Sequence, residues 1–332
     1  MRTIILLLLL VLSSVSVAET VNVYSYRQPF LIAPILDSFT KDTGIKTKVI
    51  FAKKGLIQRI KREGKLSPAD VVLTSNFSKL LQLKSDGITQ TFSSEGAISE
   101  NVPAKFRDSE AHWVALTKRV RNIYSSKERL GKINISYEEL ASDKFKGKIC
   151  TRSGKHPYNL GLIASLIAHN GEAEAKAWLT AVKGNLARKP QGNDRAQVKA
   201  IKEGLCDVSL GNSYYYGKMF SDSKQVAWAN AVEINFPNQN NRGSHINVSG
   251  AAIAKYAPNK KAAQALLEYL TTNKAQSLYA ELNMEYPVKN GVAPSALVGS
   301  WGQFKEDDIS LEVLADNIKT ALKLTDQTKF DL

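Results

Sequence analysis

The stretch VNVYSYRQPFLIAPILDSFTKDTGIKTKVIFA, residues 21–52, contains the alternation on which the fold prediction depends. It predicts one strand over Val21–Tyr26 and a second over Lys46–Ala52. Between them, apolar residues recur at helical spacing over Ile32–Thr43, and Gly44 is a typical helix end. This order of strand, helix and strand predicts a largely parallel sheet with helices on both faces.

The same alternation continues along the chain and then restarts. A helix ending at Gly64 precedes a buried strand over Val71–Thr74, and the strand Lys148–Thr151 opens a second series. Two longer strands, predicted over Trp113–Tyr124 and Val226–Phe236, run past the places where the pattern restarts. We therefore expect an α/β protein of two lobes joined by these two strands. Further helices are predicted over Tyr137–Leu140, Lys260–Thr271, Lys274–Leu282 and Leu311–Leu324.

The N-terminus has the pattern of a secretory signal peptide. A short basic start precedes an apolar run over Ile4–Leu12, and small residues end at Ala18, after which cleavage is predicted. No other stretch approaches the roughly 20 apolar residues of a membrane span. We expect an exported, periplasmic chain of 314 residues (332 − 18), long enough for two lobes.

Charge and motif content exclude several classes of function. The formal net charge is +14, but the basic residues are spread over the whole chain, which disfavours nucleic-acid binding. A general attraction for anions stays open. The nucleophile, metalloprotease and phosphate-loop motifs of common enzymes are missing, and the four histidines are too far apart for a zinc site. We therefore predict that the chain is not an enzyme.

Two cysteines, Cys150 and Cys206, are present. In an oxidising compartment they predict one disulfide, which would tether the segment carrying Tyr158 to the segment carrying Tyr214. Two unrelated buried thiols are the alternative.

Tyrosines occupy two positions where a strand is expected to lead into a helix. Tyr214-Tyr215-Tyr216 follows the apolar run Val208–Leu210, and Tyr158 follows Pro157, which suits the first turn of a helix. A helix N-terminus favours a nearby phenolate, and a hard trivalent cation would complete its deprotonation. The alternative is an aromatic patch packed between sheet and helix.

Two arginines, Arg119 and Arg121, lie at i and i+2 on the strand Trp113–Tyr124, so their side chains point to the same face. Because adjacent guanidinium groups repel each other, we expect the two arginines to hold an anion between or beside them. Without such an anion, we expect the arginines to lack a counter-charge near the cleft. A solvated face with separate carboxylate partners is the alternative. Gln28 lies at the end of the first strand, where ligands bind in parallel sheets.

Eight short motifs together resemble the bacterial ferric iron-binding proteins of ABC uptake systems, over nearly the whole chain after the signal peptide. They are Val23-Tyr24-Ser25-Tyr26-Arg27-Gln28, Thr43-Gly44-Ile45, Ser67-Pro68-Ala69-Asp70-Val71, Arg119-Val120-Arg121, Lys148-Ile149-Cys150, Gly192-Asn193-Asp194, Gly211-Asn212-Ser213-Tyr214-Tyr215 and Asn247-Val248-Ser249-Gly250.

The resemblance implies the hinged, two-lobed periplasmic binding-protein fold with a ligand cleft between the lobes. It implies Tyr158, Tyr214 and Tyr215 as ferric ligands and Tyr216 as a packing neighbour. It further implies a synergistic anion such as carbonate, held by Arg119 or Arg121. Many relatives have His-Tyr where this chain has Gln28-Pro29, which leaves two alternatives: the first lobe ligates iron directly, or it only supports anion and water through Gln28.

The implied function is periplasmic capture of Fe³⁺ and its delivery to an inner-membrane ABC permease with its ATPase. The lobes are expected to comprise residues 19–116 with 242–290 and residues 117–241 with 291–332, in a monomer. The alternative is a binding protein of the same fold for another small anionic or amine solute.

Overall fold

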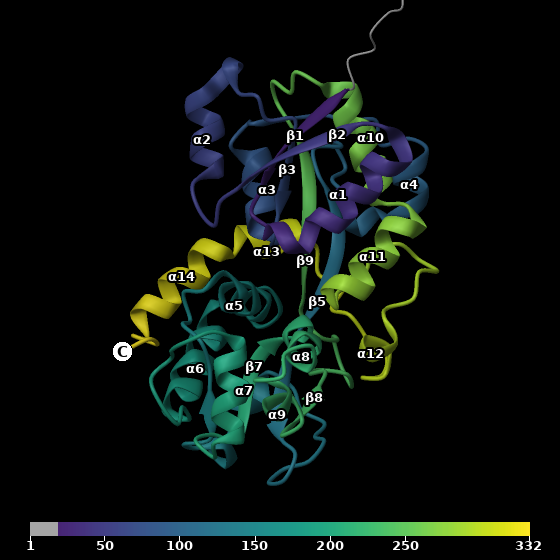
Figure 1. Cartoon of the computed structure of the whole chain (residues 1–332). Coiled ribbons are helices and arrows are strands. Elements are labelled where there is room, and N and C mark those ends of the chain that lie inside the picture. The colour runs from purple at the N-terminus through teal and green to yellow at the C-terminus, as the bar shows by residue number, and fades with distance from the viewer. Residues whose placement is uncertain (1–18) are drawn as a thin grey trace, which may run out of the picture.

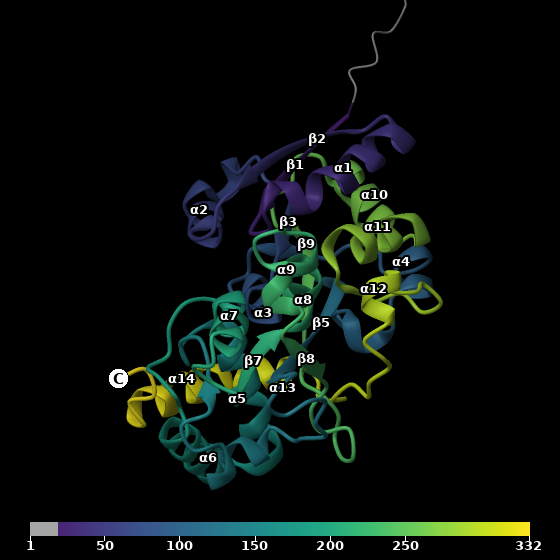
Figure 2. The same ribbon diagram turned by 60° about the horizontal axis from the view of Figure 1, so that its bottom comes forward.

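The computed structural model describes residues 19–332, so the signal peptide predicted over residues 1–18, with its cleavage site, lies outside the described residues. The chain forms two lobes, one above the other in Figure 1 and in Figure 2, and strand β5 runs from the upper lobe into the lower one, with β9 beside its upper half. Within residues 19–332, no helix is both long and apolar enough to cross a membrane.

The first lobe is built on strands in the order β2-β1-β3-β9-β5. Strand β1 (Thr20–Ser25) pairs in parallel with both β2 (Lys46–Phe51) and β3 (Val71–Thr74). The next strand, β9 (Ile246–Ala254), is antiparallel to β3 and to β5 (Val114–Ser126). The two-residue strands β4 (Thr89–Gln90) and β10 (Tyr286–Pro287) add to β9 and β5.

The second lobe is built on the other half of β5. Residues 121–126 of β5 pair antiparallel with β7 (Val208–Asn212) and β8 (Val232–Asn235), and β6 (Ile149–Cys150) lies parallel to β7. Residues 114–120 of the same strand pair with β9 in the first lobe. The prediction of a long connecting strand in this region is therefore confirmed. Strand β5 belongs to the sheets of both lobes and so connects them directly.

Two other predictions about the sheet are wrong. It is not largely parallel, because β5 and β9 run in opposite directions and pair antiparallel with each other and with β3, β7 and β8. The segment Val226–Phe236 does not connect the lobes: its first part is helix α9 (Val226–Ala229), and β8 pairs only with the second-lobe half of β5. The chain instead returns to the first lobe through residues 237–245, which lead into β9. The prediction failed because alternating apolar residues indicate a strand but do not indicate which sheet the strand joins.

Helices cover both parts of the sheet (Figure 1). Those around the first lobe are α1 (Pro29–Thr43), α2 (Leu56–Glu63), α3 (Phe77–Ser85), α4 (Ala97–Asn101), α10 (Lys260–Leu270) and α11 (Asn273–Asn283). Those around the second lobe are α5 (Pro157–Asn170), α6 (Glu172–Gly184), α7 (Asp194–Lys202), α8 (Ser213–Phe220) and α9. Helix α1 buries its predicted apolar face and ends at Gly44, whose φ of 75° is the left-handed conformation that glycine favours.

The C-terminal segment crosses back to the second lobe. After α12 (Ala296–Gly299), the predicted helix over Leu311–Leu324 is two helices, α13 (Leu311–Asp316) and α14 (Ile318–Gln327), which meet at Asn317. Helix α13 contacts both α3 and α5, and α14 packs on α5 and α6. Near Tyr137–Leu140 the chain forms only a short 3-10 turn, Glu138–Ala141.

Candidate functional site

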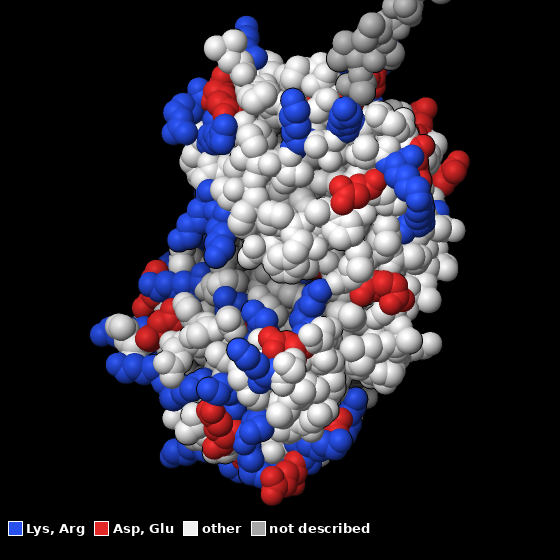
Figure 3. Space-filling model, viewed as in Figure 1, with Lys and Arg blue, Asp and Glu red and all other residues white. Residues whose placement is uncertain are grey.

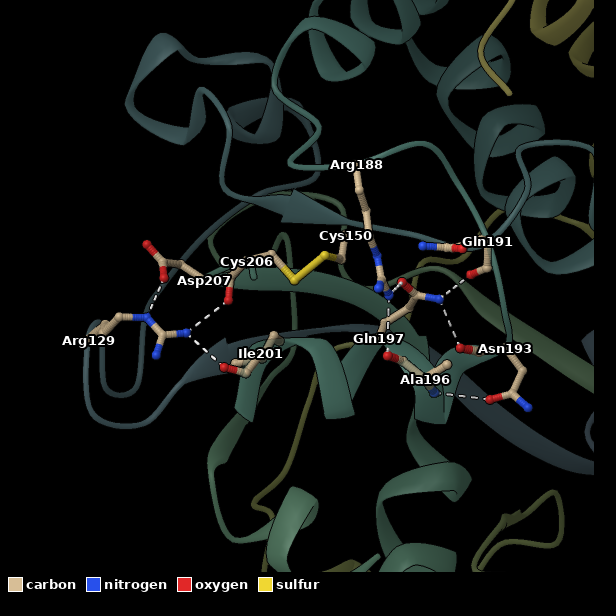
Figure 4. The surroundings of a disulfide bond; sticks show 10 residues. All are labelled: Arg129, Cys150, Arg188, Gln191, Asn193, Ala196, Gln197, Ile201, Cys206 and Asp207. Carbon is tan, nitrogen blue, oxygen red and sulfur yellow. Dashed lines mark hydrogen bonds and ion pairs between the residues drawn. A yellow bond between two sulfur atoms is a disulfide. The ribbon is translucent and has the colours of Figure 1, made fainter. Parts of the chain in front are cut away.

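A disulfide bond joins Cys150 to Cys206, as predicted, with their Cα atoms 5.9 Å apart. It links the end of β6 to the turn before β7, and these are the strands that lead to the tyrosine-bearing segments. Hydrogen bonds from Arg129 also hold this turn: its guanidinium donates to the carbonyl oxygens of Ile201 and Cys206 (Figure 4). The covalent bridge therefore restrains both strands below the tyrosines.

Each predicted tyrosine segment begins a helix. Pro157 occupies the first turn of α5, and Nδ1 of His156 accepts a hydrogen bond from the backbone nitrogen of Tyr158. Asn212 immediately precedes α8, a position where its residue type is a good helix cap, but its side chain makes no capping bond; its Oδ1 instead accepts a hydrogen bond from Nη1 of Arg121 at 3.2 Å. Two strand–helix junctions thus present their tyrosines toward the junction of the lobes.

The structure brings five of the six predicted site residues together around one cavity of about 200 Å³. Those five are Tyr158, Tyr214, Tyr215, Arg119 and Gln28. The remaining lining residues come mostly from the first lobe and are Tyr26, Arg27, Leu31, Ser75, Asn283 and Glu285. Since the tyrosines come from the second lobe and Gln28 from the first, the cavity is an interlobe cleft. Figure 3 shows basic side chains beside the hollow between the lobes.

The phenol groups are clustered within this cavity. The hydroxyl oxygens of Tyr158 and Tyr214 lie 3.4 Å apart, and the rings of Tyr214 and Tyr215 lie 4.1 Å apart between centroids. Tyr216 points elsewhere: its hydroxyl donates to the carbonyl oxygen of Val232, and its ring packs against Trp301. Oxygen atoms from two helices can therefore meet at one point, and the third consecutive tyrosine takes a packing position.

Burial favours the protonated form of Tyr214 and Tyr215 in the metal-free protein. It raises the pKa of Tyr214 well above its usual value, with a further contribution from Tyr158, and the same two causes raise the pKa of Tyr215 to about 12. The favourable effect predicted for the helix N-terminus is thus outweighed by loss of solvent. A cation must displace protons to bind here.

Guanidinium groups surround the phenol cluster. The Arg119 guanidinium carbon lies 5.7 Å from the ring centroid of Tyr158, and that of Arg152 lies 5.4 Å from the same ring. Arg195 lies 5.7 Å from the ring of Tyr215. The charge of Arg119 partly offsets the rise in the pKa of Tyr214, and that of Arg152 partly offsets the rise in the pKa of Tyr215.

The two predicted arginines have different surroundings, and the expectation that they lack a counter-charge is wrong. Arg119 lines the cavity, where its Nη1 lies 3.5 Å from Glu285, and Glu285 also accepts from Arg27 at 2.9 Å. Arg121 does not line the cavity. Its Nη1 lies 2.7 Å from Asp194, and its Nη2 donates to Asn159 at 2.6 Å.

The sequence reading missed Glu285, Arg27, Arg152 and Asp194 as parts of this region. Asp194 belongs to the quoted Gly192-Asn193-Asp194 motif and Arg27 to the first-strand motif, so both offered a signal. Glu285 offered none, because it is 166 positions from Arg119 and only the fold brings them together. Within residues 19–332, no three His, Cys, Asp or Glu side chains gather into a group that could hold a metal ion.

Comparisons with known proteins agree with this fold. Residues 53–305 match the family model described as bacterial extracellular solute-binding protein. The chain is 40% identical to iron uptake protein A1 of Synechocystis sp. over 313 residues, covering 93% of this chain and 87% of the relative.

Two solved structures are also similar. Ferric iron-binding protein A of Mannheimia haemolytica, in an open conformation, superposes with a TM-score of 0.91 at 56% identity, over 95% of this chain and 100% of the other. The Trichodesmium protein IdiA (FutA), in complex with iron and citrate, superposes with a TM-score of 0.88 at 40% identity, over 94% and 99%. The chain therefore belongs to the family of bacterial extracellular solute-binding proteins that includes these iron-uptake and ferric iron-binding relatives.

Proposed function

We propose that this protein captures ferric iron in the periplasm through the phenolate oxygens of Tyr158, Tyr214 and Tyr215. The observation that carries the proposal is the convergence of these three side chains on one interlobe cavity, with two of their hydroxyl oxygens 3.4 Å apart. Iron-uptake and ferric iron-binding relatives support the same cargo.

The chemistry of the donors favours Fe³⁺ over softer metal ions. Oxygen ligands suit a hard cation, whereas zinc and copper prefer imidazole or thiolate donors. Three phenolates neutralise the three charges of the ion. Because the phenols of Tyr214 and Tyr215 are neutral before iron arrives, binding releases protons, and acid weakens it.

A synergistic anion completes the proposed site. Three tyrosines leave about three positions of an octahedral ion free, and a bidentate anion such as carbonate fills two of them. Arg119 and Gln28 both line the cavity and can donate to such an anion. Arg121 is not part of this proposed anion site, because its guanidinium is bound to Asp194 and Asn159.

The cargo is delivered by a change in lobe separation. Lobes comprising residues 19–116 with 242–290 and residues 117–241 with 291–332 would open around β5 to release iron. An inner-membrane ABC permease and its ATPase receive it, and the protein acts as a monomeric carrier rather than an enzyme. A predicted signal peptide ending at Ala18 accounts for the periplasmic location.

The test is a visible titration of the purified, iron-free protein with ferric nitrilotriacetate. Wild type should develop a phenolate-to-iron charge-transfer band that saturates at one iron per chain. Tyr158→Phe, Tyr214→Phe and Tyr215→Phe should each weaken or shift the band. Tyr216→Phe is the matched control, since its ring packs outside the cavity, and it should leave the band nearly unchanged. A colourless wild type with stoichiometric ferric iron would refute the tyrosine site.

A further inference from the structure

A glycine lies three positions after a cavity tyrosine on each of the two tyrosine helices. Gly161 follows Tyr158 on α5, and Gly217 follows Tyr214 on α8. Residues three apart lie on the same side of a helix, so each glycine is beside its tyrosine, one turn further along. Both glycines have ordinary helical backbones, so freedom of the backbone does not explain them.

Both glycines are in close contact with side chains that project from the first lobe. A Cβ atom at Gly217 would lie 2.7 Å from Cγ and 2.8 Å from Cβ of Met284, which follows α11. A Cβ atom at Gly161 would lie 3.1 Å from Cε1 of Phe77, the first residue of α3, and 3.1 Å from Nε2 of His245. Each tyrosine helix therefore packs closely against the other lobe: at Gly217 a Cβ atom would force a shift, and at Gly161 it would fit only tightly.

The conformation of Met284 supports a role at this contact. It ends α11 in the left-handed conformation, with φ of 57°, where glycine is the usual residue. A side chain in this conformation is strained, and such strain is typical of functional positions. Here the strained residue places its Cβ and Cγ over Gly217. Beside this packing contact, the Lys218 ammonium donates a hydrogen bond to the carbonyl oxygen of Leu282, so α8 and the end of α11 are joined at a second point.

We propose that Gly161 and Gly217 are positioning residues that set how closely the two lobes approach around the tyrosine cavity. A methyl group at either position holds the lobes apart without replacing any side chain that lines the cavity. The contact at Gly217 is the more sensitive one, because the Cβ of Met284 is fixed to the backbone and cannot rotate away. This inference rests on the proposed function, since iron retention reports on lobe closure.

The test compares Gly217→Ala, Gly161→Ala and the control Gly184→Ala. Gly184 ends helix α6 in the same lobe, and a Cβ atom there would meet nothing within 4 Å. Alanine is the better helix residue at all three positions, so any loss of melting temperature in iron-free Gly217→Ala or Gly161→Ala reports the close contact with the other lobe rather than a weakened helix. Iron release to an excess of a competing chelator is followed by loss of the visible band.

Gly217→Ala should release iron about tenfold faster than wild type and Gly161→Ala about threefold faster, on the scale at which overpacking acts. Gly184→Ala should match wild type. The double variant Gly217→Ala/Met284→Gly removes the atoms that the new methyl group would meet, the Cβ of residue 284 included, so its release rate should fall to within about twofold of Met284→Gly alone. Release from Gly217→Ala and Gly161→Ala at the rate of Gly184→Ala would overturn the proposal.

Two further measurements keep the outcomes separate. If Gly217→Ala melts at a lower temperature than wild type, the double variant decides between the explanations. Recovery of both the melting temperature and the iron-release rate supports the proposed contact between Gly217 and residue 284, and no recovery overturns it. Small-angle X-ray scattering of the iron-free proteins needs no metal, and Gly217→Ala should show a larger radius of gyration than Gly184→Ala; equal radii would count against the proposal. A wild type that takes up no iron would refute the proposed function but leave the scattering comparison intact.

Discussion

The carboxylate of Asp194 lies 2.7 Å from the guanidinium of Arg121, and both side chains are buried. The same carboxylate accepts hydrogen bonds from Arg152 at 3.0 Å and from the backbone nitrogen of Asn212 at 2.9 Å. Although burial works against ionisation, the two guanidinium groups hold the pKa of Asp194 below its usual value. One side chain at the start of α7 thus joins β5, the loop after β6 and the end of β7 below the tyrosines.

Asp194→Asn should lower the free energy of unfolding by about 3–5 kcal/mol, because it leaves two buried guanidinium groups without their counter-charge. Urea unfolding of the iron-free protein measures this loss. Asp326→Asn is the control, since Asp326 pairs with Lys155 on the surface and both are more than half exposed, so a much smaller loss of stability is expected. Equal stability losses for the two variants would contradict the role assigned to Asp194.

Arg119→Ala and Arg121→Ala should differ in kind. Arg119 lines the cavity, so its loss should make iron release faster and remove the dependence of release on bicarbonate. Arg121 is bound to Asp194 outside the cavity, so its loss should lower the melting temperature while the bicarbonate dependence of wild type persists. Release to a competing chelator, with and without bicarbonate, separates the two. If bicarbonate affects neither wild type nor variant, Gln28 with water is the better account of the free positions.

Iron binding should release about two or three protons per ferric ion at pH 7, because the phenols of Tyr214 and Tyr215 have raised pKa values and are neutral beforehand. The sign follows directly: protons compete with iron, so the apparent affinity falls as pH falls, by about 100-fold per pH unit for two protons. Calorimetry in two buffers with different heats of ionisation counts the protons. Binding without proton release would mean that neutral groups hold the iron.

The disulfide should contribute up to about 4 kcal/mol in the chain-entropy model, since it closes a loop of 56 positions. Urea unfolding of Cys150→Ser/Cys206→Ser beside wild type measures this contribution. Iron release should also become faster in that variant, because both bridged strands lead to the tyrosine helices. The oxidised wild type should show no free thiol when denatured; two titratable thiols would refute the bridge in solution.

Individual helices and strands could be predicted from the sequence, because the spacing of apolar residues and the positions of glycine and proline act over a few neighbouring residues. The helix in residues 29–43 was recognised from its apolar spacing and from Gly44, and Pro157 marked the start of α5. The segment Val226–Phe236 was misassigned because its alternation is equally compatible with either lobe. The break of the last helix at Asn317 was missed, since the apolar pattern of α13 continues into α14: both helices pack on α5, while α13 also packs on α3 and α14 on α6.

The sequence by itself determined the types of donor that this protein offers: two tyrosine segments at predicted strand–helix junctions, two cysteines and a pair of arginines two residues apart. Only the tertiary structure decided which of them meet. Arg119 and Arg121 share a strand face, yet Glu285 and Asp194, distant in the chain, divide them between the cavity and the interior. The physical reason is that a buried charge needs a nearby counter-charge, and its partner is chosen by three-dimensional packing rather than by sequence spacing.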